Sequence, residues 1–228
     1  ESKKKNIRKE AQSSEDPKRD TSPRSQILQS IKKLVTLGII NDNKDKEGKV
    51  TSELNPESET TFAEMLKMVL LLAKKDISDM DNVRVRNTSA QGQWSAPYIA
   101  MAEQLKIPMF TKTLNVNMPI TRGMAIQLII DVLDIEMKES SSRRVYRDVP
   151  SRYPYASAIT TAVQLGWVSA DSNGFFHPNV SITRAEAADI LAKVIEWQDD
   201  VPKKKSIFNR FNPIEPLKRV SRRSLGFL

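Results

Sequence analysis

The sequence predicts a mainly α-helical fold with short extended segments. Two observations support this prediction. Apolar residues recur at helical spacing in six segments. These segments form three units, each of which has a first helix, a polar loop and a second helix. The second helices open at Thr61, Thr121 and Thr183, an interval of about 60 residues that suits helical repeats with variable linkers. We therefore expect three helix-loop-helix units.

The first helix of each unit is predicted from an apolar face and from the residue that ends it. Ile31 and Leu34 share such a face in the first unit. Gly38 and Gly166 stand where the first and third of these helices should end, because glycine adopts a left-handed conformation at little cost. Lys106 has the corresponding place in the second unit and suits it less well.

The second helix of each unit is predicted from its capping residues. Thr183 and Glu186 have the spacing of a capping box, in which the hydroxyl accepts a first-turn N–H and the carboxylate accepts the threonine N–H. Thr61 and Glu64 repeat this spacing. The second unit keeps its threonine but has Met124 where the glutamate belongs. Its cap is therefore expected to be incomplete.

The basic residues are concentrated at the two ends of the chain. The net charge is +8, but segments 1–23 and 200–228 hold a large share of it and lack helical or strand periodicity. We interpret them as basic tails that are solvated or touch a cell wall. The units between them, 24–76, 77–140 and 141–199, are nearly balanced. Interleaved aromatic residues of an RNA-binding module are missing, so we expect no specific nucleic-acid site.

Composition argues against several other kinds of site. The chain has no cysteine and one histidine, His177, so it has no disulfide framework and no zinc site that needs two histidines. No apolar run approaches the roughly 18 residues of a transmembrane helix. No signal peptide is visible and the chain does not open with methionine, so we expect a mature or trimmed form.

Motifs for catalysis or cofactor binding are also missing from the sequence. It contains no P-loop, dinucleotide fingerprint or nucleophile elbow. The acidic stretch "NDNKDKEG" lacks the glycine that an EF-hand calcium loop requires at its sixth position. We therefore expect a protein that is not an enzyme and that needs no cofactor or metal.

The third unit resembles the repeat of the S-layer homology family in "YRDVP", "YASAI", "LGWVSADSNGFFHPN" and "ITRAEAADILAKVI". The second unit resembles it in "WSAPYIAMAEQLKI" and "PITRGMAIQLI", and the first in "LGII", "LNPES" and "TFAEMLKMVLLL". The resemblance covers about residues 24–198. It implies three repeats in a pseudo-threefold arrangement, with the T-R-A-E helices in a central bundle and grooves between neighbouring repeats.

This resemblance also implies a function. The grooves of the family bind an anionic secondary cell-wall polysaccharide, often pyruvylated, and hold a secreted surface protein to the bacterial envelope. Possible partners are therefore such a polysaccharide, another anionic envelope polymer and a larger surface protein. An arginine beside a helix N-terminus suits this chemistry, because a guanidinium group can bind a carboxylate with two parallel hydrogen bonds.

Five residues match the family's ligand-binding positions. Arg184 and Arg122 match its arginine, Asp148 its aspartate and Trp94 its groove tryptophan, for which Tyr155 substitutes in the third unit. The resemblance implies that Arg184, Asp148 and an aromatic residue share one cleft.

An alternative function and alternative roles for these residues stay open. The first unit has Phe62 in place of the arginine. This departure suggests a scaffold module that kept the fold, lost glycan binding and recognises a protein. Arg184 is equally consistent with a solvated first-turn residue, Trp94 with a packing residue, and Asp148 with the cap of a turn. Trp167 and Trp197 are expected in the core.

Overall fold

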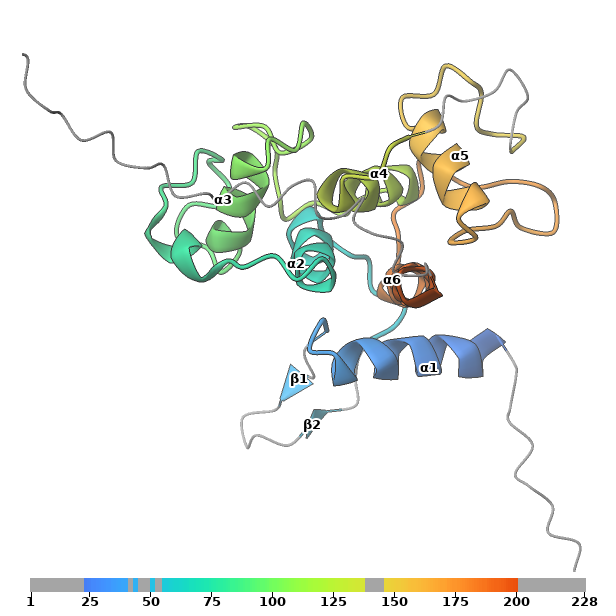
Figure 1. The fold of residues 1–228 in the computed structure, drawn as a ribbon, viewed down its shortest axis with the longest axis horizontal. Coiled ribbons are helices and arrows are strands. Elements are labelled where there is room, and N and C mark those ends of the chain that lie inside the picture. The colour runs from blue at the N-terminus through green and yellow to red at the C-terminus, as the bar shows by residue number, and fades with distance from the viewer. Residues whose placement is uncertain (1–22, 41–42, 45–49, 52–54, 138–145, 201–228) are drawn as a thin grey trace, which may run out of the picture.

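The computed structural model describes residues 23–40, 43–44, 50–51, 55–137 and 146–200 (Figure 1). Side chains are described for all of these except residues 23, 24, 43, 44, 50 and 51. Apart from their innermost residues, the two predicted basic tails lie outside the described part of the chain. None of the described helices has the length and apolar character needed to cross a membrane.

The described residues are mainly α-helical, as the sequence predicts. The longer elements are α1 (Pro23–Thr36), α2 (Phe62–Leu72), α3 (Ala96–Gln104), α4 (Arg122–Leu133), α5 (Ala156–Gln164) and α6 (Arg184–Asp200). A 3-10 helix, η1 (Ser78–Asn82), precedes α3, and two short strands, β1 (Asn43–Lys44) and β2 (Val50–Thr51), pair antiparallel after α1.

The predicted helix caps are present. The Glu64 N–H donates to Thr61 Oγ1 at 3.2 Å, and the Thr61 N–H donates to Glu64 Oε2 at 2.9 Å. Thr183 and Glu186 form the same pair of bonds at the start of α6. In the second unit the Met124 N–H donates to Thr121 Oγ1 at 3.4 Å. The reverse bond of the capping box is missing there, because Met124 stands in place of the glutamate.

The predicted left-handed residues after α1, α3 and α5 are also present. Gly38 has φ of +69° and Gly166 has φ of +76°. Lys106 adopts the same conformation with φ of +56°, although its side chain makes this less favourable than it is for glycine. The three first helices therefore end in the same way.

Three extended segments that precede α2, α4 and α6 meet at the centre of the fold. Thr60, Ile120 and Ile182 form a closed ring of backbone hydrogen bonds there, and we call these three residues the central ring. The Thr60 N–H donates to Ile182 O at 2.9 Å, the Ile182 N–H to Ile120 O at 3.0 Å, and the Ile120 N–H to Thr60 O at 2.9 Å. All three residues are buried, so no water replaces these bonds.

A second set of bonds surrounds the central ring. The first two N–H groups of each of α2, α4 and α6 donate to carbonyl groups of the segment that precedes another of these helices. The six bonds run from Phe62 to Met118, Ala63 to Val116, Arg122 to Val180, Gly123 to Pro178, Arg184 to Ser58 and Ala185 to Pro56. They satisfy donors that a helix leaves unpaired at its N-terminus.

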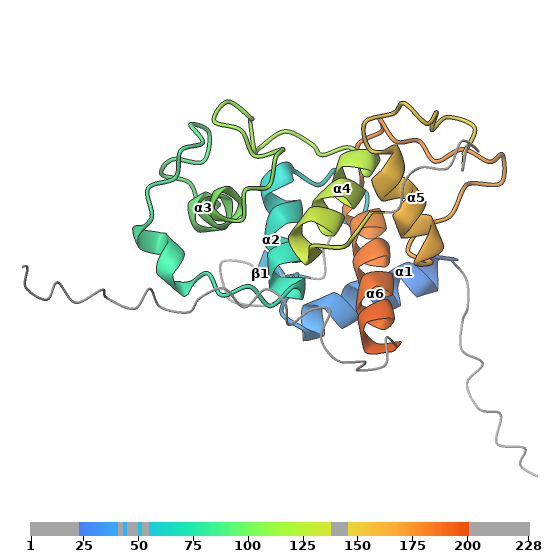
Figure 2. The same ribbon diagram turned by 45° about the horizontal axis from the view of Figure 1, so that its top comes forward.

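The helices pack across the predicted units rather than within them. In both views α3 lies beside α2, α5 beside α4 and α1 across α6 (Figures 1 and 2). The first helix of each sequence unit thus packs against the second helix of a different unit. The pair of α1 and α6 joins the first and last described helices of the chain.

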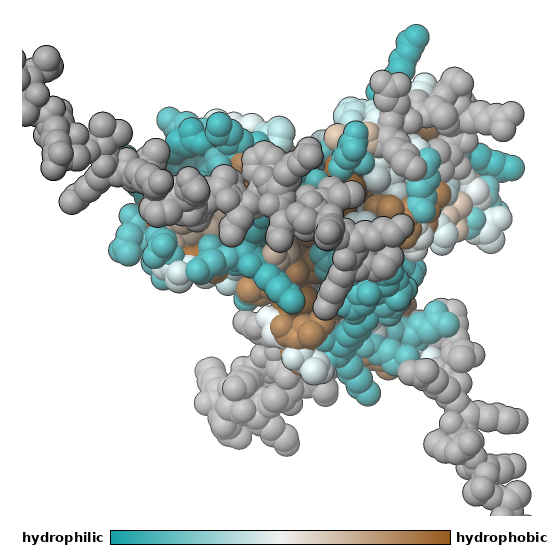
Figure 3. All heavy atoms as spheres, viewed as in Figure 1, coloured by the Kyte–Doolittle hydropathy of each residue, from teal (hydrophilic) through white to brown (hydrophobic). Residues whose placement is uncertain are grey.

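The buried apolar side chains form one cluster that all six α-helices share. Trp167 is fully buried within it, as expected, and its ring meets the half-buried Trp197 edge-on, with 5.4 Å between the ring centres. The face drawn in Figure 3 exposes apolar residues in small patches among hydrophilic ones.

Replacing a buried leucine of α1 should show how much the α1–α6 contact stabilises the fold. Leu34 is fully buried, so we expect Leu34→Ala to lower the free energy of unfolding by about 2–5 kcal/mol. Leu28 on the same helix is 48% exposed, and Leu28→Ala is the matched control, with an expected change below about 0.5 kcal/mol. Denaturant unfolding followed by tryptophan fluorescence measures both. Equal effects would contradict a docked α1.

Candidate functional site

Arg122, the first residue of α4, lies against the turn that precedes α6. Its guanidinium carbon is 4.8 Å from the centre of the Phe176 ring, which is cation–π distance. Its Nη1 lies 3.5 Å from Glu186 Oε1, and the Arg122 side chain is only 19% exposed. Its Nε is buried and has no hydrogen-bond partner among the described residues. The guanidinium group is therefore oriented but not saturated with acceptors.

Asp148 fixes the other side of this turn. One carboxylate oxygen accepts the Phe176 N–H at 2.8 Å, and the other accepts the His177 N–H at 2.7 Å. His177 adopts a left-handed conformation with φ of +61°. Asp148 thus accepts from a turn that lies 28 positions later in the chain, rather than capping the turn that directly follows it. Each carboxylate oxygen can accept a further hydrogen bond.

Arg122 and Asp148 both contact Phe176, and Tyr146 packs on the same residue. The Tyr146 ring stacks on Phe176 with 5.2 Å between the centres, and its Oη is buried without a hydrogen-bond partner among the described residues. Burial raises the pKa of Tyr146; the Arg122 charge lowers that pKa and the Asp148 charge raises it further. Both charges therefore act on the same hydroxyl group.

Two further tyrosines border this site. The rings of Tyr153 and Tyr155 meet edge-on with 5.6 Å between their centres, and the Tyr153 hydroxyl donates to Asn179 Oδ1 at 2.9 Å. A Cβ at Gly123 would lie 2.9 Å from the Tyr153 hydroxyl, so the glycine leaves room for this ring. Burial raises the pKa of Tyr153, and the charges of Tyr155 and Asp148 raise it further.

We call Arg122, Tyr146, Asp148, Tyr153, Tyr155 and Phe176 the Arg122 cluster. Arg184 lies at a different junction, where its Nη2 is 3.1 Å from Glu64 Oε1 on α2. The expected grouping of Arg184 with Asp148 is therefore corrected, because the arginine that meets the Asp148 turn is Arg122. The cause is the packing of α5 on α4, which brings residues of two sequence units together.

A family comparison identifies the segment that carries most of this cluster. Residues 145–188 match the model of the S-layer homology domain. This segment is an S-layer homology domain. It contains Asp148, Tyr155, Arg184 and the Phe176 turn, whereas Arg122 reaches it from α4. No curated protein matches the chain.

The match indicates a broad role for segment 145–188. S-layer homology domains associate with the cell surface, usually by anchoring to cell-wall polymers, and they are typically non-catalytic. The residues that the structure describes contain no group of three metal-ligating side chains.

The helix N-termini next to the S-layer homology domain do not offer free N–H groups. In α6 the first two N–H groups donate to Ser58 O and Pro56 O, and the third donates to the Thr183 hydroxyl. The neighbouring segments thus occupy the donors that the sequence suggested for an anion. An anion at these helix starts would therefore have to be bound by side chains.

The arginine–glutamate pairs repeat at two of three helix junctions. Arg184 pairs with the third residue of α2, and Arg122 pairs with the third residue of α6. The corresponding positions at the third junction are Phe62 and Met124, the third residue of α4. Phe62 is buried, and Met124 packs against the core. Both charges are thus replaced by apolar side chains at the same junction.

Trp94 lies away from Arg122, on the pair of helices α2 and α3. Its side chain is 53% exposed, and its ring meets Tyr98 edge-on with 6.0 Å between the centres. Lys67 Nζ of α2 is 5.8 Å from the Trp94 ring centre. Trp94 precedes Ser95, the N-cap residue of α3, whereas Tyr155 is itself the N-cap residue of α5. The two aromatic residues are therefore not equivalent in position.

Several residues of the site were not predicted from the sequence. Tyr146, Tyr153 and Phe176 lie within segment 145–188, yet Phe176 contacts Arg122 and Tyr153 lies close to Gly123, and both of these partners belong to a different unit. Lys67 was given no role by the sequence, although it stands in the stretch "TFAEMLKMVLLL". The aromatic residues next to "DVP" and "HPN" are the signal that could have identified the first three.

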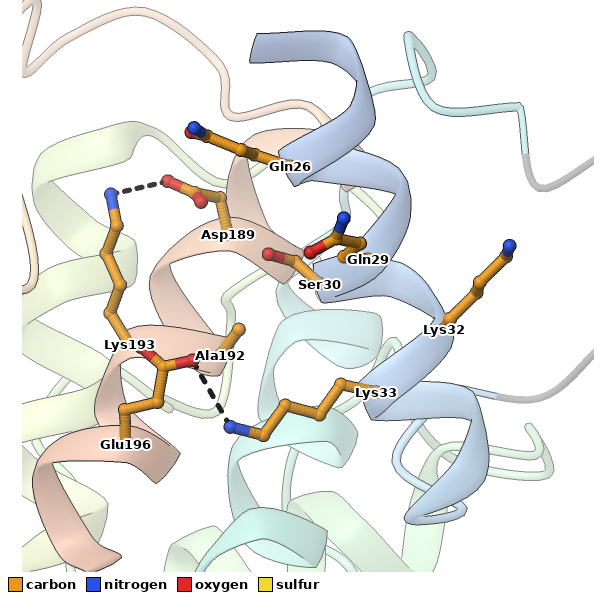
Figure 4. A pocket seen from close by; sticks show the side chains of 9 residues that line it. All are labelled: Gln26, Gln29, Ser30, Lys32, Lys33, Asp189, Ala192, Lys193 and Glu196. Carbon is orange, nitrogen blue, oxygen red and sulfur yellow. Dashed lines mark hydrogen bonds and ion pairs between the residues drawn. The ribbon is translucent and has the colours of Figure 1, made fainter. Parts of the chain in front are cut away.

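An open cleft of about 510 Å³ lies between α1 and α6 (Figure 4). Its charged lining is largely paired internally. Lys33 Nζ lies 3.3 Å from Glu196 Oε1, and Lys193 Nζ lies 2.7 Å from Asp189 Oδ2. The two ion pairs compensate most of the charge along the cleft, so it supports the α1–α6 contact rather than a charged ligand.

A double-mutant cycle tests the apolar junction. Phe62→Arg alone should lower the free energy of unfolding by more than about 1 kcal/mol, because it places an unpaired charge at a buried position. Adding Met124→Glu should recover part of this loss through an Arg–Glu pair, with a coupling free energy of about 0.5–3 kcal/mol in urea unfolding. Met137→Glu, at an exposed methionine beyond α4, is the control and should not couple. Strict additivity of Phe62→Arg and Met124→Glu would refute the pairing.

The turn before α6 should depend on the ionised form of Asp171. Its carboxylate accepts the Phe175 N–H at 2.9 Å and contacts His177 Nε2 at 2.9 Å. The Phe175 bond, then the His177 bond, lowers the pKa of Asp171 below 3.8. Its stabilisation of the turn is present above pH 3.8 and is lost as the pH falls through the lowered pKa.

An NMR acid titration of the Phe175 amide, whose N–H donates to Asp171, measures this loss. Asp171→Asn should remove the transition, and Asp199→Asn, at an exposed acid of α6, should leave it in place. A transition that persists in Asp171→Asn would assign it to another group.

Proposed function

We propose that the chain is a non-catalytic anchoring module that binds an anionic secondary cell-wall polysaccharide at the bacterial surface. The Arg122 cluster carries this proposal. It places a partly unsatisfied guanidinium group beside a carboxylate and several aromatic rings, within and next to an S-layer homology domain. An acidic sugar needs such a combination, because its carboxylate pairs with arginine and its apolar face stacks on an aromatic ring.

We also propose that residues 24–76, 77–140 and 141–199 are three S-layer homology repeats in a pseudo-threefold arrangement. The central ring supports this, because its three hydrogen bonds follow one cyclic pattern. The bonds between helix starts and neighbouring segments support it too. The first N–H groups of α2, α4 and α6 follow one cyclic pattern, and the second N–H groups follow another of the same kind. The second and third repeats then contribute jointly to the Arg122 cluster.

The ligand carboxylate is expected to compete with Glu186 for Arg122. The Arg122–Glu186 pair is long, at 3.5 Å, and Glu186 is 45% exposed, so this pair is weak. Arg184 is held more closely by Glu64, at 3.1 Å. Arg122 is therefore the stronger candidate for the ligand, and Arg184 is a second one. Asp148 and Tyr155 are proposed to contact sugar hydroxyl groups and the sugar ring.

Retention on purified pyruvylated wall polysaccharide tests this function. Arg122→Ala removes a charge-assisted hydrogen bond worth about 1.5–3 kcal/mol. We therefore expect the affinity of this variant for the polysaccharide to fall about 10- to 100-fold. Arg84→Ala removes an exposed arginine elsewhere and serves as the charge-matched control, for which we expect little change.

The outcomes of this experiment separate two function classes. A wild-type chain without affinity for the polysaccharide at low and moderate salt would refute wall anchoring through this site. The remaining function would then be a scaffold that recognises a protein. Binding that survives Arg122→Ala but disappears with salt would instead assign it to the basic ends of the chain.

A further inference from the structure

The turn between α5 and α6 contains the only asparagine–glycine pair of the chain, Asn173 followed by Gly174. Asparagine side chains are thermolabile, and a glycine that follows one leaves its backbone nitrogen open to the asparagine side chain, because it has no Cβ. Asn173 is exposed, so water reaches its side-chain amide. The pair thus has the composition and the exposure of a site for spontaneous chemical modification.

Other asparagines differ from Asn173 in burial or in the residue that follows them. Asn87 is fully buried, and its side-chain amide donates to two backbone carbonyl groups. Asn179 is exposed, but a β-branched valine follows it, and its Oδ1 accepts from the Tyr153 hydroxyl at 2.9 Å. Asn117 is exposed too, and methionine follows it. Asn173 therefore has the least hindered neighbouring N–H group.

A cation lies beside the Gly174 backbone. The Arg147 N–H donates to Gly174 O at 3.0 Å, and a Cβ at Gly174 would lie 3.6 Å from Arg147 Nε. None of the ion pairs among the described residues includes Arg147. Its positive charge therefore stabilises negative charge that develops on the Gly174 nitrogen or on a carbonyl oxygen that this nitrogen attacks.

One hydrogen bond opposes such an attack. The Gly174 N–H donates to Asp171 O at 3.0 Å, and this bond must open before the Gly174 nitrogen can lose its proton. The bond belongs to an exposed turn, where local opening costs little free energy. We therefore expect the reaction to be slower in the folded chain than in the unfolded chain, and still measurable.

We propose that Asn173 is a site of deamidation through a cyclic imide. A base in the solvent takes the Gly174 amide proton, and the Gly174 nitrogen forms a bond to the side-chain carbonyl carbon of Asn173. The bond between that carbon and the side-chain nitrogen breaks, and this nitrogen leaves as ammonia with a proton from water. Water then opens the ring at one of its two carbonyl groups, which gives aspartate or isoaspartate. The reaction needs only water and a base, so it goes beyond wall binding and does not depend on it.

The product adds a carboxylate to the turn that positions Phe176. The Asp171 carboxylate accepts the Asn173 N–H at 2.8 Å and the Phe175 N–H at 2.9 Å. A new carboxylate at position 173 repels it. Isoaspartate also lengthens the main chain by a methylene group, so the two N–H groups cannot both keep their places. Because the Phe176 ring lies on Arg122, formation of isoaspartate should loosen that contact.

Peptide mapping by mass spectrometry after incubation of the full chain at mildly alkaline pH tests this site. The peptide that holds Asn173 should gain the mass of an amide-to-acid change and separate into aspartate and isoaspartate forms. Asn173→Gln should remove the conversion there, because the longer side chain has to close a larger ring. Asn117 and Asn179 in the same digest are internal controls and should convert at least about tenfold more slowly. Conversion of Asn173 no faster than theirs would overturn the site.

The contribution of the cation has its own test. Arg147→Gln should slow the conversion of Asn173 about two- to fivefold, because an exposed charge contributes little in water. Arg84→Gln, at an exposed arginine elsewhere, is the control and should leave the rate unchanged. Equal rates in the wild type and Arg147→Gln would overturn the role of Arg147.

Amide NMR of the incubated chain measures the effect on the turn. The Phe176 N–H signal should shift in the isoaspartate form, because its bond to Asp148 depends on the turn. Asn173→Asp adds the charge without lengthening the main chain, so it is the matched variant and should show a smaller shift. A Phe176 signal that does not move in the isoaspartate form would overturn the effect on the Arg122 cluster.

Discussion

The central ring of Thr60, Ile120 and Ile182 is the constraint on which the rest of the structure depends. An extended segment cannot satisfy its own N–H and C=O groups, and a buried group left unpaired costs about 1–3 kcal/mol. Each ring residue donates to one neighbour and accepts from the other, so the three bonds close only when all three segments are present. The helices that follow these segments are consequently placed relative to one another by backbone bonds as well as by side-chain packing.

This backbone arrangement decides what the helix starts can do. The first N–H groups of α2, α4 and α6 donate to carbonyl groups of the neighbouring segments, so their hydrogen-bonding capacity is already used. Charge recognition then depends on side chains at the same helix starts. Arg122 and Arg184 meet this need because a guanidinium group extends beyond the backbone bonds and still reaches a carboxylate. Their glutamate partners on the neighbouring helices hold both guanidinium groups in place.

Local features of this fold could be predicted from the sequence, whereas the partners of each helix could not. Thr61 with Glu64 and the glycine at position 38 act through bonds and φ values within a few residues, so short patterns identified them. The contact of Arg122 with Phe176 joins α4 to a turn 54 positions later in the chain, and no local pattern specifies it. Matching residues within one unit therefore grouped Arg184 with Asp148, although helices pack across units.

The cyclic arrangement also explains how the three junctions can differ in chemistry. Each junction uses its own side chains, while the backbone bonds that hold the helices are the same at all three. The α2–α4 junction could thus exchange an arginine–glutamate pair for Phe62 and Met124 without disturbing the central ring, provided that both charges were lost together. A single replacement would have left an unpaired charge in a partly buried place. Because the fold does not depend on the arginine there, a cation elsewhere on α2, such as Lys67, is free to take a different position beside the exposed Trp94 ring.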